Sequence, residues 1–151
     1  MRIAITADHN GTSLKARLIP WLEERGHQVD DRATHVGTEP VDYPPLCADV
    51  CRRVLDGHAD YAIVVGGSGS GEQIACNKIR GIRAGLCHDL FTAEIARAHN
   101  DANVLVLGAK VVSPEFAEEL AATWLATSFK GERHQKRLDQ IAALERGEWL
   151  D

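Results

Sequence analysis

The sequence predicts an α/β fold, a Rossmann-like three-layer α/β/α sandwich with a five-stranded parallel sheet. Short apolar runs alternate along the chain with longer amphipathic stretches, and this alternation is typical of a parallel sheet with helices on both faces. The 151 residues, 44% of them apolar, suffice for a single sizeable core, and no linker or internal repeat interrupts them. We therefore expect residues 1–151 to form one domain.

Five short segments have the character of strands in such a sheet. Four are apolar runs bounded by glycine or polar residues, as expected of strands that are buried on both faces. The fifth follows the Gly26 stop signal and is predicted mainly from its place in the alternation. In chain order, the predicted strands cover residues 2–6, 27–32, 61–65, 82–86 and 103–107.

Six amphipathic stretches predict helices. The first has Ser13 as a candidate N-cap and an apolar stripe of leucines, although Pro20 should kink or shorten it. The second opens with two prolines, which a first turn tolerates, and the fifth opens with Ser113 as a cap followed by proline and glutamate. In chain order, the predicted helices cover residues 13–25, 43–55, 71–79, 89–98, 113–127 and 132–146.

The composition argues against several classes of protein. A formal charge of −5 disfavours nonspecific binding to nucleic acid or to an anionic membrane. No apolar run approaches the ~20 residues that cross a bilayer, and the opening MRIAITADHNG resembles a strand rather than a secretion signal. The 4 cysteines form no Cys-x-x-Cys pair, so we expect reduced, buried thiols in a cytoplasmic protein. The 7 histidines lack metal-ligand spacing, and no metal site is predicted.

The strongest functional signal is GGSGSGEQIACNK, residues 66–78, directly after the third predicted strand. Its glycines allow close approach of the backbone to a ligand, and the N–H groups of the loop and helix start can bind an anion or oxyanion. The segment lacks the Lys-Ser/Thr of a Walker loop and the last glycine of a dinucleotide fingerprint. The carboxylate of Glu72 favours proton transfer instead. Alternatively, Glu72 only stabilises the helix N-terminus, although a structural turn does not need four glycines.

Further polar residues follow other predicted strands. Asp8, His9 and Asn10 come after the first strand, where a parallel sheet binds ligands, although an Asx turn closed by Gly11 has the same sequence. Lys110, just beyond the last strand, is a cation at another carboxyl end.

A second set of polar residues belongs to helices. His99 and Asn100 end the fourth predicted helix, where a histidine also serves as a C-terminal cap. Arg133 and Arg137 are four residues apart on one helix face, with His134 nearby. They could hold a phosphate dianion by charge-assisted hydrogen bonds, or simply form a solvated basic face.

Taken together, these residues resemble the type B ribose-5-phosphate isomerase family, which also contains isomerases of galactose 6-phosphate, allose 6-phosphate and tetrulose phosphates. The resemblance covers nearly the whole chain and rests on ADHNG at 7–11, DYPPLCADV at 42–50, GGSGSGEQIACNKIRGIRAGL at 66–86 and HNDANVLVLGAK at 99–110. It implies a small phosphorylated sugar as substrate and no metal or organic cofactor. It also implies a homodimer with shared active sites, in some members paired into tetramers.

The glycine loop departs from many members of this family at the catalytic base. Those members have a sequence like CGTG with the cysteine as base, whereas this chain has GGSG, so the thiol position falls on Gly66 or Gly67. The chain resembles the subgroup in which the glutamate of GGSGxGEQ is the base, which is Glu72. Cys76, on the following helix, is expected to be a packing residue.

The resemblance implies a role for each candidate residue. Glu72 would move a proton between C2 of the aldose and C1 of the ketose through a cis-enediolate, and His99, with Asp8 near it, would assist ring opening. Asn100 would bind substrate hydroxyls, and Lys110 stands where glutamate-type members tend to have arginine, so it keeps the charge but loses a bidentate contact. Ser68 and the backbone of the loop would hold the oxyanion, with Gly67, Gly69, Ser70 and Gly71 lining the substrate site. The phosphate would be bound by His9, Arg133 and Arg137, the last two on the helix at about 132–146.

The implied function is the interconversion of ribose 5-phosphate and ribulose 5-phosphate. This reaction needs one base, an oxyanion site and an anion anchor, and the sequence offers all three. One alternative is another phosphosugar with four or six carbons, because the length of the pocket depends on loops such as 32–43. A second is a non-catalytic sugar-phosphate-binding module, which would have no use for Glu72.

Overall fold

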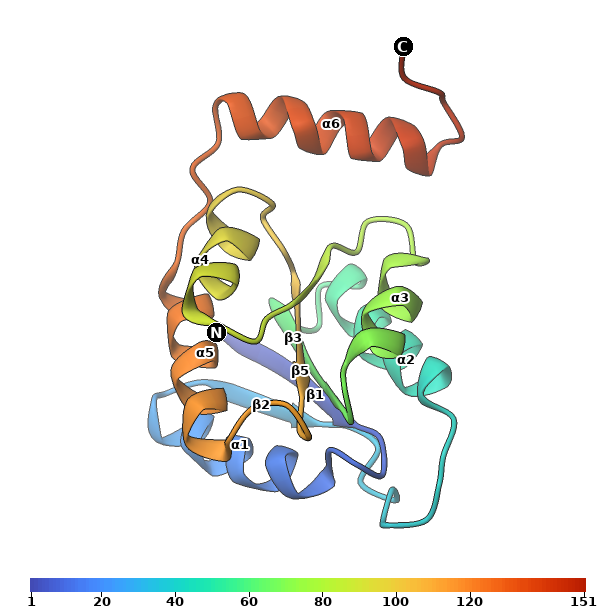
Figure 1. Cartoon of the computed structure of the whole chain (residues 1–151). Coiled ribbons are helices and arrows are strands. Elements are labelled where there is room, and N and C mark those ends of the chain that lie inside the picture. Colours follow the sequence, from blue (N-terminus) through green and yellow to red (C-terminus); the bar gives the residue numbers. More distant parts are fainter.

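A five-stranded parallel sheet forms the centre of the computed structural model, which describes all residues from 1 to 151 (Figure 1). The strand order is β2-β1-β3-β5-β4, and every neighbouring pair is parallel. The strands are β1 (Arg2–Ala7), β2 (Gln28–Asp31), β3 (Tyr61–Gly66), β4 (Ala84–Leu86) and β5 (Val104–Gly108). The predicted fold class and all five predicted strands are therefore confirmed.

Helices cover both faces of the sheet. One face packs against α1 (Thr12–Glu24), α4 (Leu90–Ala98) and α5 (Pro114–Ala126), and the other against α2 (Tyr43–Leu55) and α3 (Ser70–Asn77). Side chains alternate between the faces along a strand, so Ile3 and Ile5 of β1 join the first core while Ala4 joins the second. These are the three layers that the sequence predicts.

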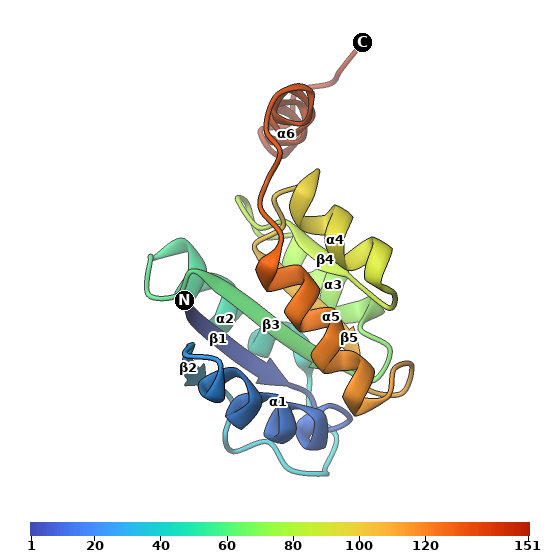
Figure 2. The ribbon, with the colours of Figure 1, turned by 90° about the vertical axis from the view of Figure 1, so that its left-hand side faces the viewer.

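The last helix, α6 (Arg133–Glu145), lies beyond the amino ends of the strands rather than on a face of the sheet (Figures 1 and 2). The segment that leads to it is held where the backbone N–H of Lys130 donates to the carbonyl of Ala98 at 2.9 Å. His134 and Leu138 are buried, whereas most of α6 is exposed. The body of the chain therefore covers only a narrow side of this helix.

The first helix differs from its predicted start. The prediction that Ser13 is the N-cap is wrong: α1 begins at Thr12, Gly11 occupies the N-cap position, and Ser13 is exposed. The Gly11 carbonyl accepts the first helical hydrogen bond, from the N–H of Lys15 at 2.9 Å, and Gly11 packs so closely on β3 that a Cβ there would overlap the carbonyl oxygen of Val65. The helix then continues through Pro20 to Glu24, so the proline does not shorten it.

All four cysteines are buried and none is in a disulfide, as the sequence predicts. Three of them, Cys47, Cys51 and Cys76, pack together between α2 and α3. A scan of the helices finds no span with the length and apolar character that a membrane crossing requires.

The strand order of the sheet alone indicates where a ligand would bind. The chain leaves β1 towards β2 on one side and later joins β3 on the other, so the winding direction reverses between β1 and β3. In parallel sheets, ligands bind at the carboxyl ends of the strands beside such a reversal. Asp8 directly follows β1 and Gly67 directly follows β3, so both loops lie at this point.

Candidate active site

The turn after β1 is built around the buried carboxylate of Asp8. It accepts hydrogen bonds from the backbone N–H groups of Asn10, at 2.8 Å, and Gly11, at 3.1 Å, and from the Asn10 side-chain amide at 3.1 Å. This is an Asx turn, so Asp8 has a structural role as well as a place in the site. His9, next in the chain, accepts a hydrogen bond at Nδ1 from the N–H of Val41 at 3.3 Å, which joins this turn to the loop before α2.

The glycine loop between β3 and α3 is fixed to the edge of the sheet. The carbonyls of Gly66 and Gly67 accept hydrogen bonds from the N–H groups of Ala109, at 2.8 Å, and Lys110, at 2.9 Å, directly after β5. Gly69 has a φ of 79°, a left-handed conformation that favours glycine. The loop is therefore held by the rigid ends of two neighbouring strands.

The N–H groups of this loop remain free for a ligand. Those of Gly67, Ser68, Gly69 and Gly71 donate to no acceptor within the chain, whereas Ser70 N–H donates to Ser68 Oγ at 3.2 Å. They stand at the N-terminus of α3, where the helix dipole adds a positive potential. Of the predicted oxyanion donors, only the amide of Ser70 is already engaged, and the amides of Gly69 and Gly71 are available to an anion.

Glu72, in the first turn of α3, places its carboxyl group over the backbone of Gly66. Only 4% of Glu72 is exposed, and a Cβ on Gly66 would lie no more than 2.5 Å from either carboxylate oxygen. Burial raises the pKa of Glu72, a hydrogen bond from its own backbone N–H lowers it, and the charge of Asp8 raises it again. The net shift is upward, so Glu72 is a stronger base than an exposed glutamate.

These groups line one open cavity of about 610 Å³ at the carboxyl edge of the sheet. Three acids, Asp8, Asp42 and Glu72, face this cavity, against Lys110 and His9. The other lining residues are Asn10, Val41, Tyr43, Gly67, Ser68 and Gly71. Because the acids outnumber the cations, this part of the chain alone is poorly suited to hold a phosphate dianion. It brings a buried carboxylate and free N–H groups together but offers no strong anion anchor.

A second cluster joins the end of α4 to the start of α6. The imidazole rings of His99 and His134 are stacked, with centroids 3.9 Å apart and planes at 16°. Burial lowers the pKa of His134, as do the charges of His99, Arg133, Arg137 and Lys130. Both arginines are exposed on α6, and an Nη atom of Arg137 lies 3.5 Å from Nδ1 of His134. This concentration of positive charge suits an anion.

The two clusters lie at opposite edges of the sheet. The chain reverses direction through α4, so His99 lies near the start of β5, whereas the glycine loop follows the end of β3. The five residues of β5 alone correspond to ~15 Å. In Figure 1, α6 lies at the top while the carboxyl ends of β1 and β3 point to the bottom. The expectation that Asp8 lies near His99 is therefore not met within one chain, and Asn100, Arg133 and Arg137 do not meet Glu72 either.

Two residues of these clusters were not singled out as candidates in the sequence. Tyr43 lines the cavity and packs on the glycine loop, where a Cβ on Gly71 would lie 2.5 Å from its hydroxyl oxygen. The available signal was its position at the start of the helix after the 32–43 loop. His134 appeared only as a neighbour of the arginines, and nothing in its spacing revealed the stack on His99. No group of three or more His, Cys, Asp or Glu side chains is arranged to hold a metal ion.

We expect Glu72→Gln to stabilise the fold at neutral pH and to leave it unchanged in acid. The raised pKa means that the folded state binds the proton of Glu72 more tightly than the unfolded chain. This proton contributes its full stabilisation at any pH below the pKa that Glu72 has in the unfolded chain. The stabilisation is lost as the pH rises through the pKa that Glu72 has in the folded protein. Thermal melts of the wild-type protein and the variant, from acidic to neutral pH, measure the effect. Glu115→Gln is the control, because its pKa is lowered and its substitution should not stabilise at neutral pH.

Comparisons with known proteins find relatives over almost the whole chain. Residues 3–141 match the family model described as Ribose/Galactose Isomerase. The chain is 40% identical over 144 residues to ribose-5-phosphate isomerase B of Escherichia coli, covering 95% of this chain and 96% of that protein. It is 37% identical over 147 residues to the protein of the same name in Mycobacterium tuberculosis, covering 97% and 91%. A solved structure of ribose-5-phosphate isomerase B from Clostridium thermocellum is similar with a TM-score of 0.95 and 42% identity, covering 97% of this chain and 99% of that chain.

Proposed function

Because the chain belongs to the ribose/galactose isomerase family, we propose that it is an aldose–ketose isomerase that interconverts ribose 5-phosphate and ribulose 5-phosphate. The observation that carries this proposal is the buried carboxylate of Glu72 beside the free N–H groups of the glycine loop. A sugar-phosphate-binding module without activity would use the loop but gain nothing from a buried base of raised pKa. The arrangement therefore favours the enzyme.

Glu72 is the base in this proposal. It takes the proton from C2 of the open-chain aldose and returns it to C1, so that one side chain serves both half-reactions. The intermediate is a cis-enediolate, whose negative oxygen accepts hydrogen bonds from the free N–H groups of Gly69 and Gly71 and from the Ser68 hydroxyl. These donors are fixed before the substrate arrives, because the loop is tied to the ends of β3 and β5.

The environment of Glu72 is matched to this task. A glutamate at a helix N-terminus is normally a weak base, because the dipole and N–H donors stabilise its ionised form. Here burial and the neighbouring Asp8 outweigh that effect and raise the pKa of Glu72. The carboxyl group therefore holds a proton more readily during the transfer than an exposed glutamate does.

A second copy of the chain would complete the site. We propose a homodimer in which the His99–α6 cluster of one copy faces the Glu72 cavity of the other, so that the acidic cavity gains a cationic partner. Arg133 and Arg137 would then bind the phosphate, with His9 and Lys110, and His99 and Asn100 would assist ring opening and hydroxyl binding. The position of α6 beyond the sheet leaves its arginines exposed for such a contact.

We also place the protein in the cytoplasm and in the pentose phosphate pathway. Four free, buried thiols suit a reducing compartment. The pathway follows from the proposed substrate pair. The proposed reaction uses no metal or organic cofactor.

Replacing Gly66 by alanine should lower kcat by about 100-fold with little effect on KM. The new methyl group would overlap the Glu72 carboxyl group and displace it, and a shift of ~1 Å at a reacting group is enough for a loss of this size. Steady-state kinetics with ribose 5-phosphate measure the effect. Gly37→Ala is the matched control, because a Cβ at Gly37 meets nothing within 4 Å. Normal turnover of Gly66→Ala would contradict the assigned position of the base.

The substrate is tested with a panel of aldose phosphates of four, five and six carbons, compared by kcat/KM. We expect ribose 5-phosphate to have the highest value, and the unphosphorylated sugar to react far more slowly because it lacks the anchor. A four- or six-carbon phosphate as the best substrate would assign the chain to another phosphosugar of the family. Binding of all of them without turnover would support the non-catalytic module instead.

A further inference from the structure

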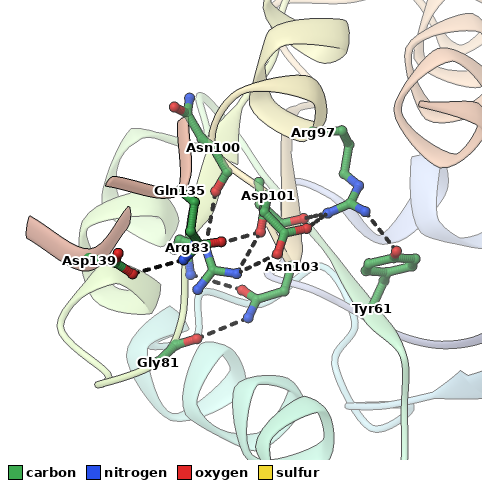
Figure 3. A network of polar contacts seen from close by, with 10 residues as sticks. Tyr61, Gly81, Arg83, Arg97, Asn100, Asp101, Asn103, Gln135 and Asp139 are labelled. Carbon is green, nitrogen blue, oxygen red and sulfur yellow. Dashed lines mark hydrogen bonds and ion pairs between the residues drawn. The ribbon is translucent and has the colours of Figure 1, made fainter. Parts of the chain in front are cut away.

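Two arginines, Arg83 and Arg97, bind the turn between α4 and β5 by hydrogen bonds (Figure 3). Three consecutive backbone carbonyls, those of Asn100, Asp101 and Ala102, all accept hydrogen bonds from Arg83 or Arg97. His99 and Asn100, the residues assigned above to ring opening and hydroxyl binding, stand at the start of this turn. The two guanidinium groups therefore bind the backbone of residues 100–102, which begins at Asn100 and directly follows His99.

Arg83 lies on the segment that leads into β4. Its Nε donates to the carbonyls of Asn100 and Asp101, both at 3.0 Å, and an Nη donates to the Asp101 carbonyl at 2.8 Å and to the Asp101 carboxylate at 3.1 Å. Its own backbone N–H donates to the side chain of Asn103 at 2.8 Å, and that side chain donates to the carbonyl of Gly81 at 2.9 Å. The fork of one guanidinium thus bridges two peptide units, which an ammonium group cannot reproduce.

Arg97, in the last turn of α4, holds the other side of the turn. One of its Nη atoms donates to the Asp101 carboxylate at 2.8 Å and to the Ala102 carbonyl at 2.7 Å, and the other donates to the Tyr61 hydroxyl at 2.8 Å. The guanidinium also lies 5.2 Å from the centroid of the buried Trp124 ring. Its side chain is only 7% exposed, so this charge is anchored to the core of the protein.

Asp101 is where the two arginines meet. Its φ of 43° is left-handed, which is uncommon for a residue other than glycine and costs free energy. Its carboxylate binds both guanidinium groups, and these contacts hold the strained conformation in place. The turn directs the chain from the end of α4 into β5, and His99 and Asn100 stand at its start.

We propose that Arg83 and Arg97 are positioning residues that act through Asp101 to hold His99 and Asn100 in their catalytic geometry. This inference rests on the proposed function, because it assumes that these two side chains act on the sugar. Neither arginine lines the cavity of Glu72. Neither arginine forms a hydrogen bond or ion pair with α6, and the buried carboxylate and the loop N–H groups lie at the other edge of the sheet. The effect therefore falls on turnover rather than on phosphate binding.

Arg83→Ala tests the proposal, because Arg83 is the less buried of the two arginines and its loss spares the core. With ribose 5-phosphate we expect kcat to fall ~10- to 100-fold while KM changes less than about threefold. Methylguanidinium added in the millimolar range should restore part of kcat, and Arg83→Lys should not. Arg17→Ala is the matched control, since Arg17 also binds two acids but on the exposed surface between α1 and α5. A wild-type kcat in Arg83→Ala would overturn the proposal.

Asp101→Gly is a second variant, which removes the carboxylate that joins the two arginines. Glycine can adopt a φ of 43° but also many other conformations, so the turn is no longer held in a single arrangement. We expect the same selective loss of kcat, and normal turnover here would contradict the assigned role of Asp101.

A readout without substrate separates this proposal from the proposed function. We expect the ring nitrogens of His99 to give one set of NMR resonances in the wild-type protein, and to shift and broaden in Arg83→Ala, with faster amide exchange at residues 100–103. Unchanged His99 resonances would overturn the positioning role whatever the activity. Suppose that the wild-type protein lacks isomerase activity while the His99 resonances shift in the variant. This result would overturn the proposed function but would still show that Arg83 positions His99.

Discussion

Replacing Glu72 by glutamine is expected to lower kcat for isomerisation by about 10³-fold, while the affinity for phosphosugar changes little. Glutamine has the shape of glutamate, so it fits over Gly66 and preserves the oxyanion site. It cannot accept the C2 proton, however, and no other carboxylate is mounted over the glycine loop in this way. Steady-state kinetics give kcat, and calorimetric titration with ribose 5-phosphate gives the affinity. Near-normal turnover would remove Glu72 as the base.

Two controls sharpen this result. Cys76→Ala should retain turnover, because Cys76 is buried against Cys47 and Cys51 and does not line the cavity. An inactive Cys76→Ala beside an active Glu72→Gln would move the chemistry to the thiol. The second control is deuterium exchange from heavy water into C1 of ribulose 5-phosphate. This exchange needs the base but no ring opening, so Glu72→Gln should lose it and His99→Ala should keep it.

The second large effect is expected when two inactive variants are combined. Glu72 lies at the carboxyl edge of the sheet and His99 at the amino edge. In the proposed dimer, each active site combines Glu72 of one copy with His99 of the other. A mixed dimer then contains one intact site and one site with both substitutions. Isolated mixed dimers should therefore regain about half of the wild-type activity, because one of their two sites is intact.

The mixture is prepared by co-expressing the two variants with different affinity tags and isolating the doubly tagged species. A mixture of Glu72→Gln with Gly66→Ala is the control, because both changes affect the same cavity and no intact site can form. Recovery in the first mixture and none in the second would support shared sites. Absence of recovery in a purified mixed dimer would contradict the proposed exchange of clusters between subunits.

The sequence predicted the sheet well because buried parallel strands leave an unambiguous pattern. The apolar runs before Asp8, Gly67 and Lys110 are strands in the structure, and even the weak 27–32 segment contains β2. The start of α1 was missed because it depends on a contact between Gly11 and Val65, which are far apart in the sequence. Local cap rules cannot anticipate a helix start that is set by packing on another strand.

The site was predicted unevenly for a similar reason. Glu72 and the glycine loop belong to one continuous segment, so their chemistry could be inferred from neighbouring residues alone. The separation of Asp8 from His99 follows instead from the direction in which α4 crosses the sheet. Arg83 gave no signal at all, because its side chain binds mainly backbone carbonyls, and backbone groups look the same at every position of a sequence.

The seat of the Glu72 carboxyl group over Gly66 has a consequence for the ancestry of such enzymes. The same small volume can hold the Glu72 carboxyl group or a side chain on residue 66, but not both. If the thiol of the cysteine-type members stands at residue 66 rather than 67, adding the glutamate to such an enzyme would crowd the thiol, and losing the thiol first would remove the base. Passage between the two states requires coupled mutations, for instance in a duplicated gene relieved of selection. We therefore expect the thiol and carboxylate enzymes to form two separate lineages rather than a graded series.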